Sequence, residues 1–233
     1  MANQSKQASS AHSSFKTRDA PPIPLRAEVK SYTKEECVII KCRSNPTDSS
    51  STTYDLSIPM FKEGNPEEWL KWVNNLKRAA KGQNITNGPA KFALARRLLD
   101  GGALIAFENA GTAVASESSE SLKQVIRAVT EHVFPKSAYQ KQKSYLRRFL
   151  KKPRDLSVKQ FAERVIHLNE LLGQFPNPSS TTTATKMPKD EILDLLEASM
   201  PFPWQKHMRL QGFKTLKIKN QGIFQVLQII RVD

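Results

Sequence analysis

Only two cysteines occur in the 233 residues, Cys37 and Cys42, both in the string "ECVIIKC". They have neither the C-x2-C spacing nor the partner histidines of a zinc site, and a disulfide framework needs more of them. Long apolar runs are also missing, since none approaches the roughly 18 residues of a membrane-spanning helix. The polar N-terminus lacks the apolar core of a signal peptide. We therefore expect reduced thiols, no metal, no membrane partner and a cytoplasmic location.

Groups suited to catalysis are equally scarce. The glycine pair Gly101-Gly102 is not part of a phosphate-binding loop, and the chain has no nucleophile elbow and no kinase motif. None of the histidines has a second histidine at the i, i+4 spacing of metalloproteases; they are His12, His132, His167 and His207. The sequence therefore predicts a protein that is not an enzyme and has no cofactor and no small-molecule substrate.

Positive charge, by contrast, is abundant and unevenly placed. The net charge is +14, and residues 136–175 hold 10 basic and 3 acidic side chains, which is half of the excess. Such an excess favours a polyanionic partner such as RNA. The densest stretch is "KSYLRRFLKKPRDL", and its cations, with one lysine just before it, are our candidate RNA ligands: Lys141, Lys143, Arg147, Arg148, Lys151, Lys152 and Arg154.

This stretch has two interpretations, and the sequence leaves both open. Tyr139, Tyr145 and Phe149 are interleaved with the cations, a combination that binds single-stranded nucleic acid by stacking and charge. The same aromatics also recur along one side of a helix, and the cations then form only its solvated face.

Residues 1–55 are expected to be disordered or extended. Residues 1–29 are rich in Ser, Ala, Gln and Pro and have no apolar periodicity, which is typical of disorder. The β-branched run from Val38 to Ile40 favours a short strand, and "RSNPTDSSSTT" is expected to be a loop. "YDLSIPMF" is an extended lead-in to the first domain.

Four helices are predicted within residues 56–135. The first begins at the N-cap Asn65, which is followed by proline and, three residues after the cap, by glutamate. The second begins at Pro89 and is ended by Gly101-Gly102, the third spans "ALIAFENAG", and Pro135 closes the fourth.

A second helical group covers residues 136–213, and residues 214–233 are undecided between strand and helix. Its helices are expected in "SAYQKQKSYLRRFLKK", after a cap at Asp155 or Ser157, in "KDEILDLLEAS", and from Pro203 to Gly212. These patterns predict an all-α fold of two small helical subdomains. The side chains expected to build it recur at helical spacing; they are Trp69, Trp72, Leu76, Phe92, Phe149, Phe161, Val165, Leu168, Leu172 and Trp204.

Four strings of the sequence, taken in order, resemble the capsid region of Gag proteins of long-terminal-repeat retrotransposons, over about residues 56–213. They are "IPMFKEGNPEEWLKWVNNL", "GQNITNGPAKFALARRLLDGGALIAFENA", "VTEHVFPKSAYQKQKSYLRRFLKKPRDLSVKQFAERVIHLNELLGQFP" and "DEILDLLEASMPFPWQKHMRLQGF". The likeness is closest to the Gag-like proteins of oomycete and diatom elements. Each string is short, so their common order is what makes the resemblance specific.

The resemblance implies a capsid protein of the retroviral and retrotransposon type. Its first half would help to form rings, its second half would pair subunits, and the product would be a cytoplasmic virus-like particle, a self-assembled shell around RNA. The segment "PRDLSVKQFAERVIHLNELL" would be the counterpart of the capsid major homology region. The chain departs from the family in lacking a C-x2-C-x4-H-x4-C zinc knuckle and the Asp-Thr/Ser-Gly triplet of a protease.

Two alternatives stay open at this point. The first is a domesticated capsid-like domain that binds a host protein and no longer assembles. The second is a basic helical adaptor that binds nucleic acid and is unrelated to Gag.

Overall fold

The structure, a computed structural model, describes residues 21–26, 32–176 and 184–210, with side chains up to residue 206. Over these residues the chain is mainly helical and carries one two-stranded sheet. After a 3-10 turn come β1 and β2 and then the helices: η1 (Lys34–Glu36), β1 (Cys37–Arg43), β2 (Thr53–Pro59), α1 (Pro66–Gly82), α2 (Gly88–Arg97), α3 (Gly101–Thr112), α4 (Ser119–Val133), α5 (Ala138–Arg148), α6 (Val158–Leu172), α7 (Lys189–Ala198) and α8 (Phe202–Leu210).

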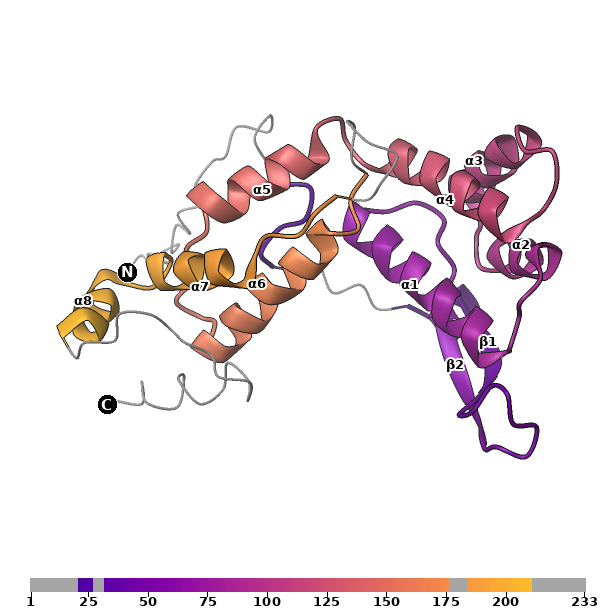
Figure 1. The fold of residues 1–233 in the computed structure, drawn as a ribbon, viewed down its shortest axis with the longest axis horizontal. Coiled ribbons are helices and arrows are strands. Elements are labelled where there is room, and N and C mark those ends of the chain that lie inside the picture. The colour runs from indigo at the N-terminus through magenta and orange to yellow at the C-terminus, as the bar shows by residue number, and fades with distance from the viewer. Residues whose placement is uncertain (1–20, 27–31, 177–183, 211–233) are drawn as a thin grey trace, which may run out of the picture.

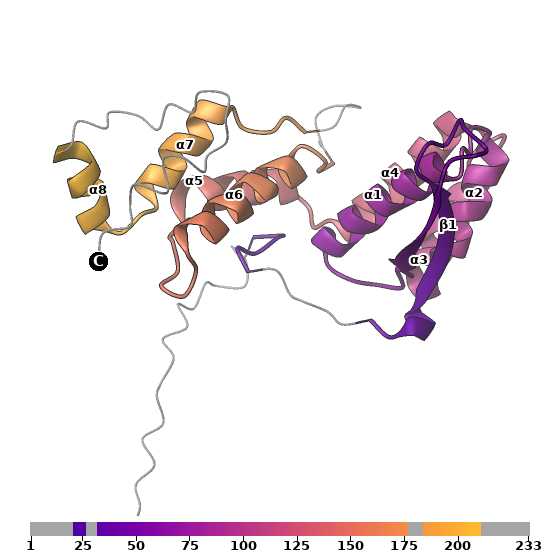
Figure 2. The same ribbon diagram turned by 90° about the horizontal axis from the view of Figure 1, so that it is seen from below.

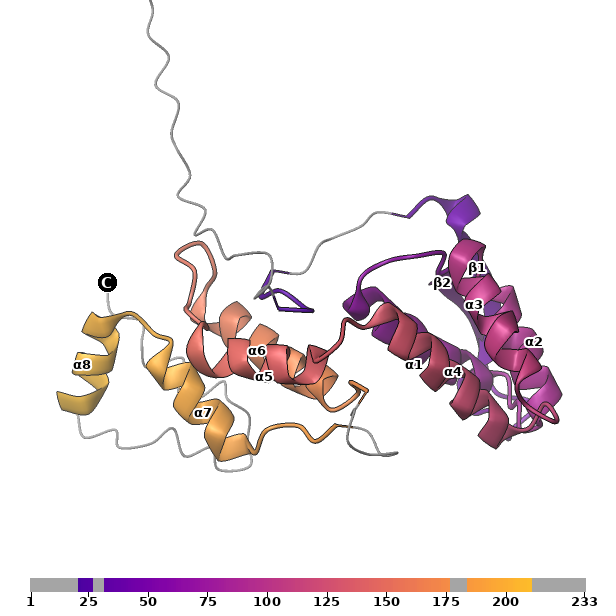
Figure 3. The same cartoon turned by 90° about the horizontal axis from the view of Figure 1, so that it is seen from above.

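The elements form two groups at opposite ends of an elongated molecule (Figures 1, 2 and 3). We call residues 32–133, which contain the sheet and α1 to α4, the first lobe. Residues 138–210, with α5 to α8, are the second lobe. Residues 134–137 connect α4 to α5, and Ser137 there has a left-handed backbone with φ of 63°.

The sheet corrects two expectations. The fold is mainly helical rather than all-α, and residues 32–55 belong to the first lobe. β1 and β2 pair antiparallel, with Ile40 opposite Leu56. Ile40, Cys42 and Ile58 are fully buried, and both strands pack against α1. The strand expected around Val38 to Ile40 is present, but its partner was expected to be only an extended lead-in. Strand pairing depends on a distant segment, which local sequence patterns do not reveal.

The core of the first lobe is centred on two tryptophans of α1. The side chain of Asn65 caps this helix by accepting a hydrogen bond from the Glu68 backbone N–H at 3.0 Å. One turn later the rings of Trp69 and Trp72 stack, with centroids 4.8 Å apart. Their indole N–H groups donate to Thr130 Oγ1 and to the backbone carbonyl of residue 98, each at 2.8 Å. Buried indole N–H groups are therefore satisfied, as a stable core requires.

The second and third helices differ from the prediction at their junction. The glycine pair was expected to end a helix, but α2 ends at Arg97 and Gly101 is the first residue of α3. The reason is a non-local contact, because the Phe61 N–H donates to the Leu98 carbonyl at 3.0 Å and the Asp100 N–H donates to the Phe61 carbonyl at 3.1 Å. The Asp100 carboxylate then caps α3 at Gly101, where φ of 52° suits glycine.

In the second lobe, α6 is the central helix. Ser157 forms a capping box with Gln160, whose side chain accepts from the Ser157 N–H at 3.0 Å. Asn169, also on α6, exchanges two hydrogen bonds with the Met187 backbone at 2.8 and 3.0 Å. The apolar stripe of this helix is buried as its spacing indicates, at Phe161, Val165, Leu168 and Leu172.

Of two aromatic residues of the expected core, Phe149 lies outside it and Trp204 packs against its edge. α5 ends at Arg148, so Phe149 leaves the helical register and its residue is 47% exposed, while Leu150 takes the buried position. The expectation that Phe149 is a core residue is wrong for this reason. Trp204 is half-buried, and Lys152 Nζ lies 5.9 Å from the centre of its ring. The expected tail of residues 214–233 lies outside the described residues.

Candidate functional site

The seven candidate RNA ligands do not share one surface. A helix repeats every 3.6 residues, so Lys141 and Arg148, seven apart, lie on one side of α5. Lys143 and Arg147, four apart, share another side. That second side faces α7, because Arg147 Nε lies 2.5 Å from Glu191 Oε1. The other three candidates follow the helix, in residues 151–154.

Three of the seven cations have protein partners. The hydrogen bond to Glu191 raises the pKa of Arg147, which therefore stays charged within an ion pair. Lys143 Nζ lies 5.7 Å from the centre of the Tyr139 ring. Lys152 Nζ donates to the Pro153 carbonyl at 3.1 Å.

The other four cations make no ion pair with any carboxylate of the described residues, and three of them are exposed. We call these four the cationic set: Lys141, Arg148, Lys151 and Arg154. An exposed cation without a carboxylate partner can neutralise a phosphate.

The three aromatic residues interleaved with these cations also differ in whether they have partners within the protein or are exposed. The Tyr139 hydroxyl donates to the Thr185 carbonyl at 2.9 Å. Burial raises the pKa of Tyr145, and the backbone of Leu25 beside its hydroxyl offsets part of this effect. Phe149 is the exposed aromatic of the three, and it follows Arg148 directly. An exposed ring next to cations is the arrangement on which a nucleotide base can stack.

A buried ion pair joins the two lobes, and no sequence pattern pointed to it. Arg164 of α6 donates two parallel hydrogen bonds to the carboxylate of Glu67 in the first turn of α1, at 2.8 and 2.7 Å. The two side chains are only 13% and 6% exposed. Bidentate arginine–carboxylate pairs fix geometry as well as charge. This pair therefore sets how α6 sits against the start of α1.

The surroundings of Glu67 keep it ionised. Burial alone would raise the pKa of this carboxyl, but hydrogen bonds from Arg164 and Lys71 outweigh burial and lower the pKa below its usual range. His167 Nε2 lies 3.9 Å from Glu67 Oε1. Burial and the charge of Arg164 lower the pKa of His167, so the imidazole is neutral at pH 7 and adds no second cation.

Residues 21–26, "PPIPLR", which we call the arm, are bound to the second lobe (Figure 1, indigo, between α5 and α6). The fully buried side chain of Gln142 pairs with both main-chain groups of Ile23, at 2.9 and 3.0 Å. Arg164 also donates to the carbonyls of Pro24 and Leu25, each at 2.8 Å.

The arm corrects the expectation that residues 1–29 are disordered, as far as residues 21–26 are concerned. Residues 1–20 and 27–29 lie outside the described residues. Ile23 and Leu25 are buried, although two apolar residues in a proline-rich segment are too few to produce a periodic pattern. The only signal in the sequence was this pair of apolar residues in a polar segment.

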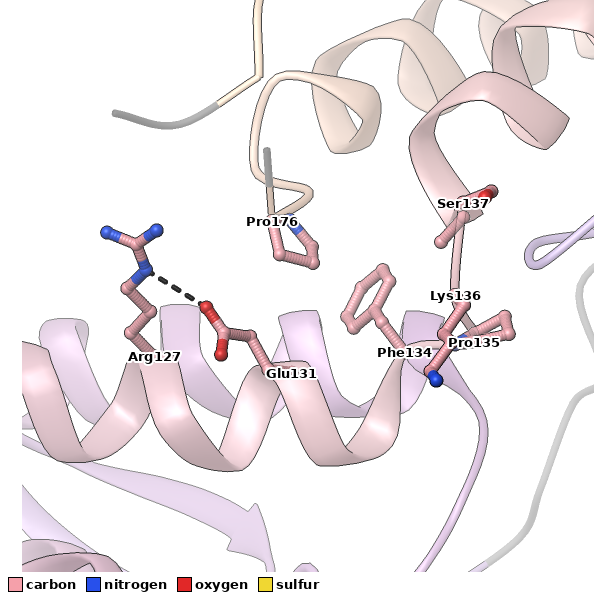
Figure 4. A pocket seen from close by; sticks show the side chains of 8 residues that line it. Arg127, Glu131, Phe134, Pro135, Lys136, Ser137 and Pro176 are labelled. Carbon is pink, nitrogen blue, oxygen red and sulfur yellow. Dashed lines mark hydrogen bonds and ion pairs between the residues drawn. The ribbon is translucent and has the colours of Figure 1, made fainter. Parts of the chain in front are cut away.

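A cavity of about 300 Å³ lies where the lobes meet (Figure 4). Figure 4 shows the ring of Phe134 facing Pro176 across it, with the Arg127–Glu131 ion pair, 3.2 Å long, to one side. Ser137 and Glu131 lie apart in this view, so the lining does not present a nucleophile beside a general base. The lining residues are Arg127, Glu131, Phe134, Pro135, Lys136, Ser137, Ala138 and Pro176.

Other kinds of site were sought in the same residues. Within residues 21–26, 32–176 and 184–210, no three His, Cys, Asp or Glu side chains come close enough to hold a metal ion. Cys37 and Cys42 are free thiols, and burial raises the pKa of Cys42. Among the described helices, none combines the length and the apolar character needed to cross a membrane.

Comparison with known proteins gives no relative. No family model, no curated protein and no solved structure matches the chain.

Proposed function

We propose that this chain is a non-enzymatic shell protein of the Gag capsid kind, which assembles with copies of itself and encloses RNA. The observation that carries the RNA part is the cationic set, four cations without carboxylate partners among the described residues, together with the exposed ring of Phe149, which follows Arg148 in the chain. Support for the assembly part comes from two helical lobes joined by the short connection at residues 134–137, together with the four strings that resemble Gag capsids.

The charge distribution favours sequence-independent RNA binding. Lysine and arginine attract phosphates of any sequence, and each contact releases counterions. The exposed ring adds base stacking, which is also tolerant of sequence. A shell protein that takes up a long RNA benefits from both properties, because it meets many different sequences.

Shell formation can be tested directly by negative-stain electron microscopy of the purified chain. We expect shells or tubes at high salt, where charge repulsion between the basic chains is screened. A monomer whose mass stays constant over a wide range of concentration would contradict the assembly part. That result would favour the alternatives, a host-protein interaction domain or a basic adaptor. Assembly and RNA binding are measured separately, so either part can fail alone.

RNA binding has its own expected result. Replacing the cationic set by glutamine should make the plot of log affinity against log salt concentration shallower by about 3, since each lost contact with single-stranded RNA removes about 0.7 from the slope. The measurement is fluorescence anisotropy with labelled oligouridine over a series of salt concentrations.

A matched control removes four exposed cations from the first lobe instead, Lys41, Lys77, Arg78 and Lys81. The net charge falls equally in both variants, so a general charge effect would change both slopes alike. The assignment requires that only the variant in the cationic set changes. An unaltered slope in that variant would refute it.

A further inference from the structure

The second lobe contains a binding site for a short main-chain segment, the arm. Gln142 on α5 is fully buried, and its amide uses both its donor and its acceptor on the backbone of Ile23. Without the arm, this amide would lose both of these bonds, and unsatisfied buried polar groups are costly. We call the side chains that hold the arm the arm site; they are Gln142, Tyr145, Asp155 and Arg164.

The contacts define what the site recognises. The side chains of Ile23 and Leu25 are buried, while Pro24 between them is exposed, and the main chain bends at residues 22–23 and 25–26. Arg26 pairs with Asp155 at 2.6 Å. Prolines limit the conformations of the free segment, which lowers the entropy lost on binding. The ligand class is therefore a bent, proline-rich segment in which two apolar residues, separated by one exposed residue, are followed by arginine.

We propose that the arm site also binds residues 21–26 of a second copy, so that two chains exchange arms. Every copy carries both the segment and the site. The hydrogen bonds and the ion pair that hold the arm lie between it and residues 142–164, and they are the same whichever chain donates the arm. Exchange of an identical element between copies is a low-cost route to association. The pairing needs neither RNA nor a shell.

Two full-length variants with complementary defects test this exchange. Ile23→Asp places a charge in the buried position and should leave the arm site empty. Gln142→Met keeps the length of the side chain but removes both hydrogen bonds, and should leave the arm free. In a mixture, the free arm of the second variant can enter the empty site of the first. At low salt, where charge repulsion opposes shell formation, we expect a 1:1 heterodimer by sedimentation velocity at about 100 µM of each chain, and monomers of each variant alone.

Pro24→Asp is the matched control, since it introduces the same charge at the exposed neighbouring position and keeps the carbonyl that Arg164 uses. Its site stays filled by its own arm, whose effective concentration is roughly millimolar. Its heterodimer with the Gln142→Met chain should be at least about tenfold weaker. Equal pairing of both aspartate variants would overturn the proposal.

A labelled peptide of residues 20–27 gives a second measurement, independent of shell formation. It should bind the Ile23→Asp chain and not the Gln142→Met chain. Circular dichroism shows whether each chain is folded, and Leu25→Asp replaces Ile23→Asp if the latter is not. Folded variants that neither pair nor bind the peptide would overturn arm exchange, while shells seen by microscopy would still support the proposed function.

Discussion

Replacing Arg164 by methionine is expected to lower the free energy of unfolding by about 3 kcal/mol or more, because the change leaves the Glu67 carboxylate buried without its bidentate partner. Four hydrogen bonds are lost together, two to Glu67 and two to carbonyls of the arm. Urea denaturation followed by circular dichroism measures the effect.

The double variant Glu67→Gln with Arg164→Met separates charge from packing. Removing both charges should recover part of the loss, since a neutral buried side chain costs less than a buried carboxylate whose remaining ion-pair partner is Lys71. As a control, Arg127→Met removes an arginine from an ion pair that is half exposed, and its effect should stay below about 1 kcal/mol. A loss no larger for Arg164 than for Arg127 would contradict the role assigned to the buried pair.

The same pair predicts a dependence on pH. The folded protein lowers the pKa of Glu67 below its value in the unfolded chain. Its contribution is thus fully present above the unfolded value, about 4.3, and is lost as pH falls through the folded pKa. The stability difference between wild type and Arg164→Met should therefore be constant near neutral pH and shrink below about pH 4. A difference that grows with acidity would contradict the assignment.

Replacing Trp69 by alanine is expected to destabilise the first lobe by about 4 kcal/mol. Its fully buried ring stacks on Trp72, meets the edge of Phe61 at a centroid distance of 5.2 Å and donates to Thr130. Alanine leaves a large cavity and removes the donor to the Thr130 hydroxyl, which keeps only its own bond to the Ile126 carbonyl. Thermal and urea denaturation report the loss.

Two further substitutions define what Trp69 contributes. Trp69→Phe keeps most of the packing and loses the indole N–H, so its cost should be about half or less. Ile105→Ala removes a large apolar side chain from a position that is 63% exposed, and should cost less than about 0.5 kcal/mol. If Trp69→Ala were as mild as Ile105→Ala, the tryptophan pair would not be the centre of this core.

The helices were largely predictable because the residues that determine where a helix begins lie at that place in the sequence. Asn65 and Ser157 cap helices whose apolar stripes recur at helical spacing, so no distant information was needed. The end of α2 was not predictable, since it depends on backbone bonds to Phe61. The prediction that Phe149 is buried was wrong for a related reason. The apolar periodicity of the sequence continues through Phe149, but α5 ends one residue before it.

The candidate site was predictable only as a charge-rich segment. Sequence spacing placed seven cations together, but it could not show that Arg147 is paired with Glu191 on α7 or that Lys152 lies over Trp204. The arm site was missed entirely. In the sequence, the arm lies more than a hundred residues before Gln142 and Arg164, and neither of these two residues belongs to a recognisable motif. Only the fold brings them together with Ile23.

The contacts of Gln142 determine which substitutions the arm can accept during evolution. Its amide pairs with the main chain at position 23 rather than with the side chain, and every amino acid except proline offers the same N–H and carbonyl. The arm can thus accept many substitutions at the exposed position 24 while its binding mode persists. A search for distant relatives should therefore look for a buried amide and an arginine in the positions of Gln142 and Arg164, on neighbouring helices, rather than for the letters of the arm.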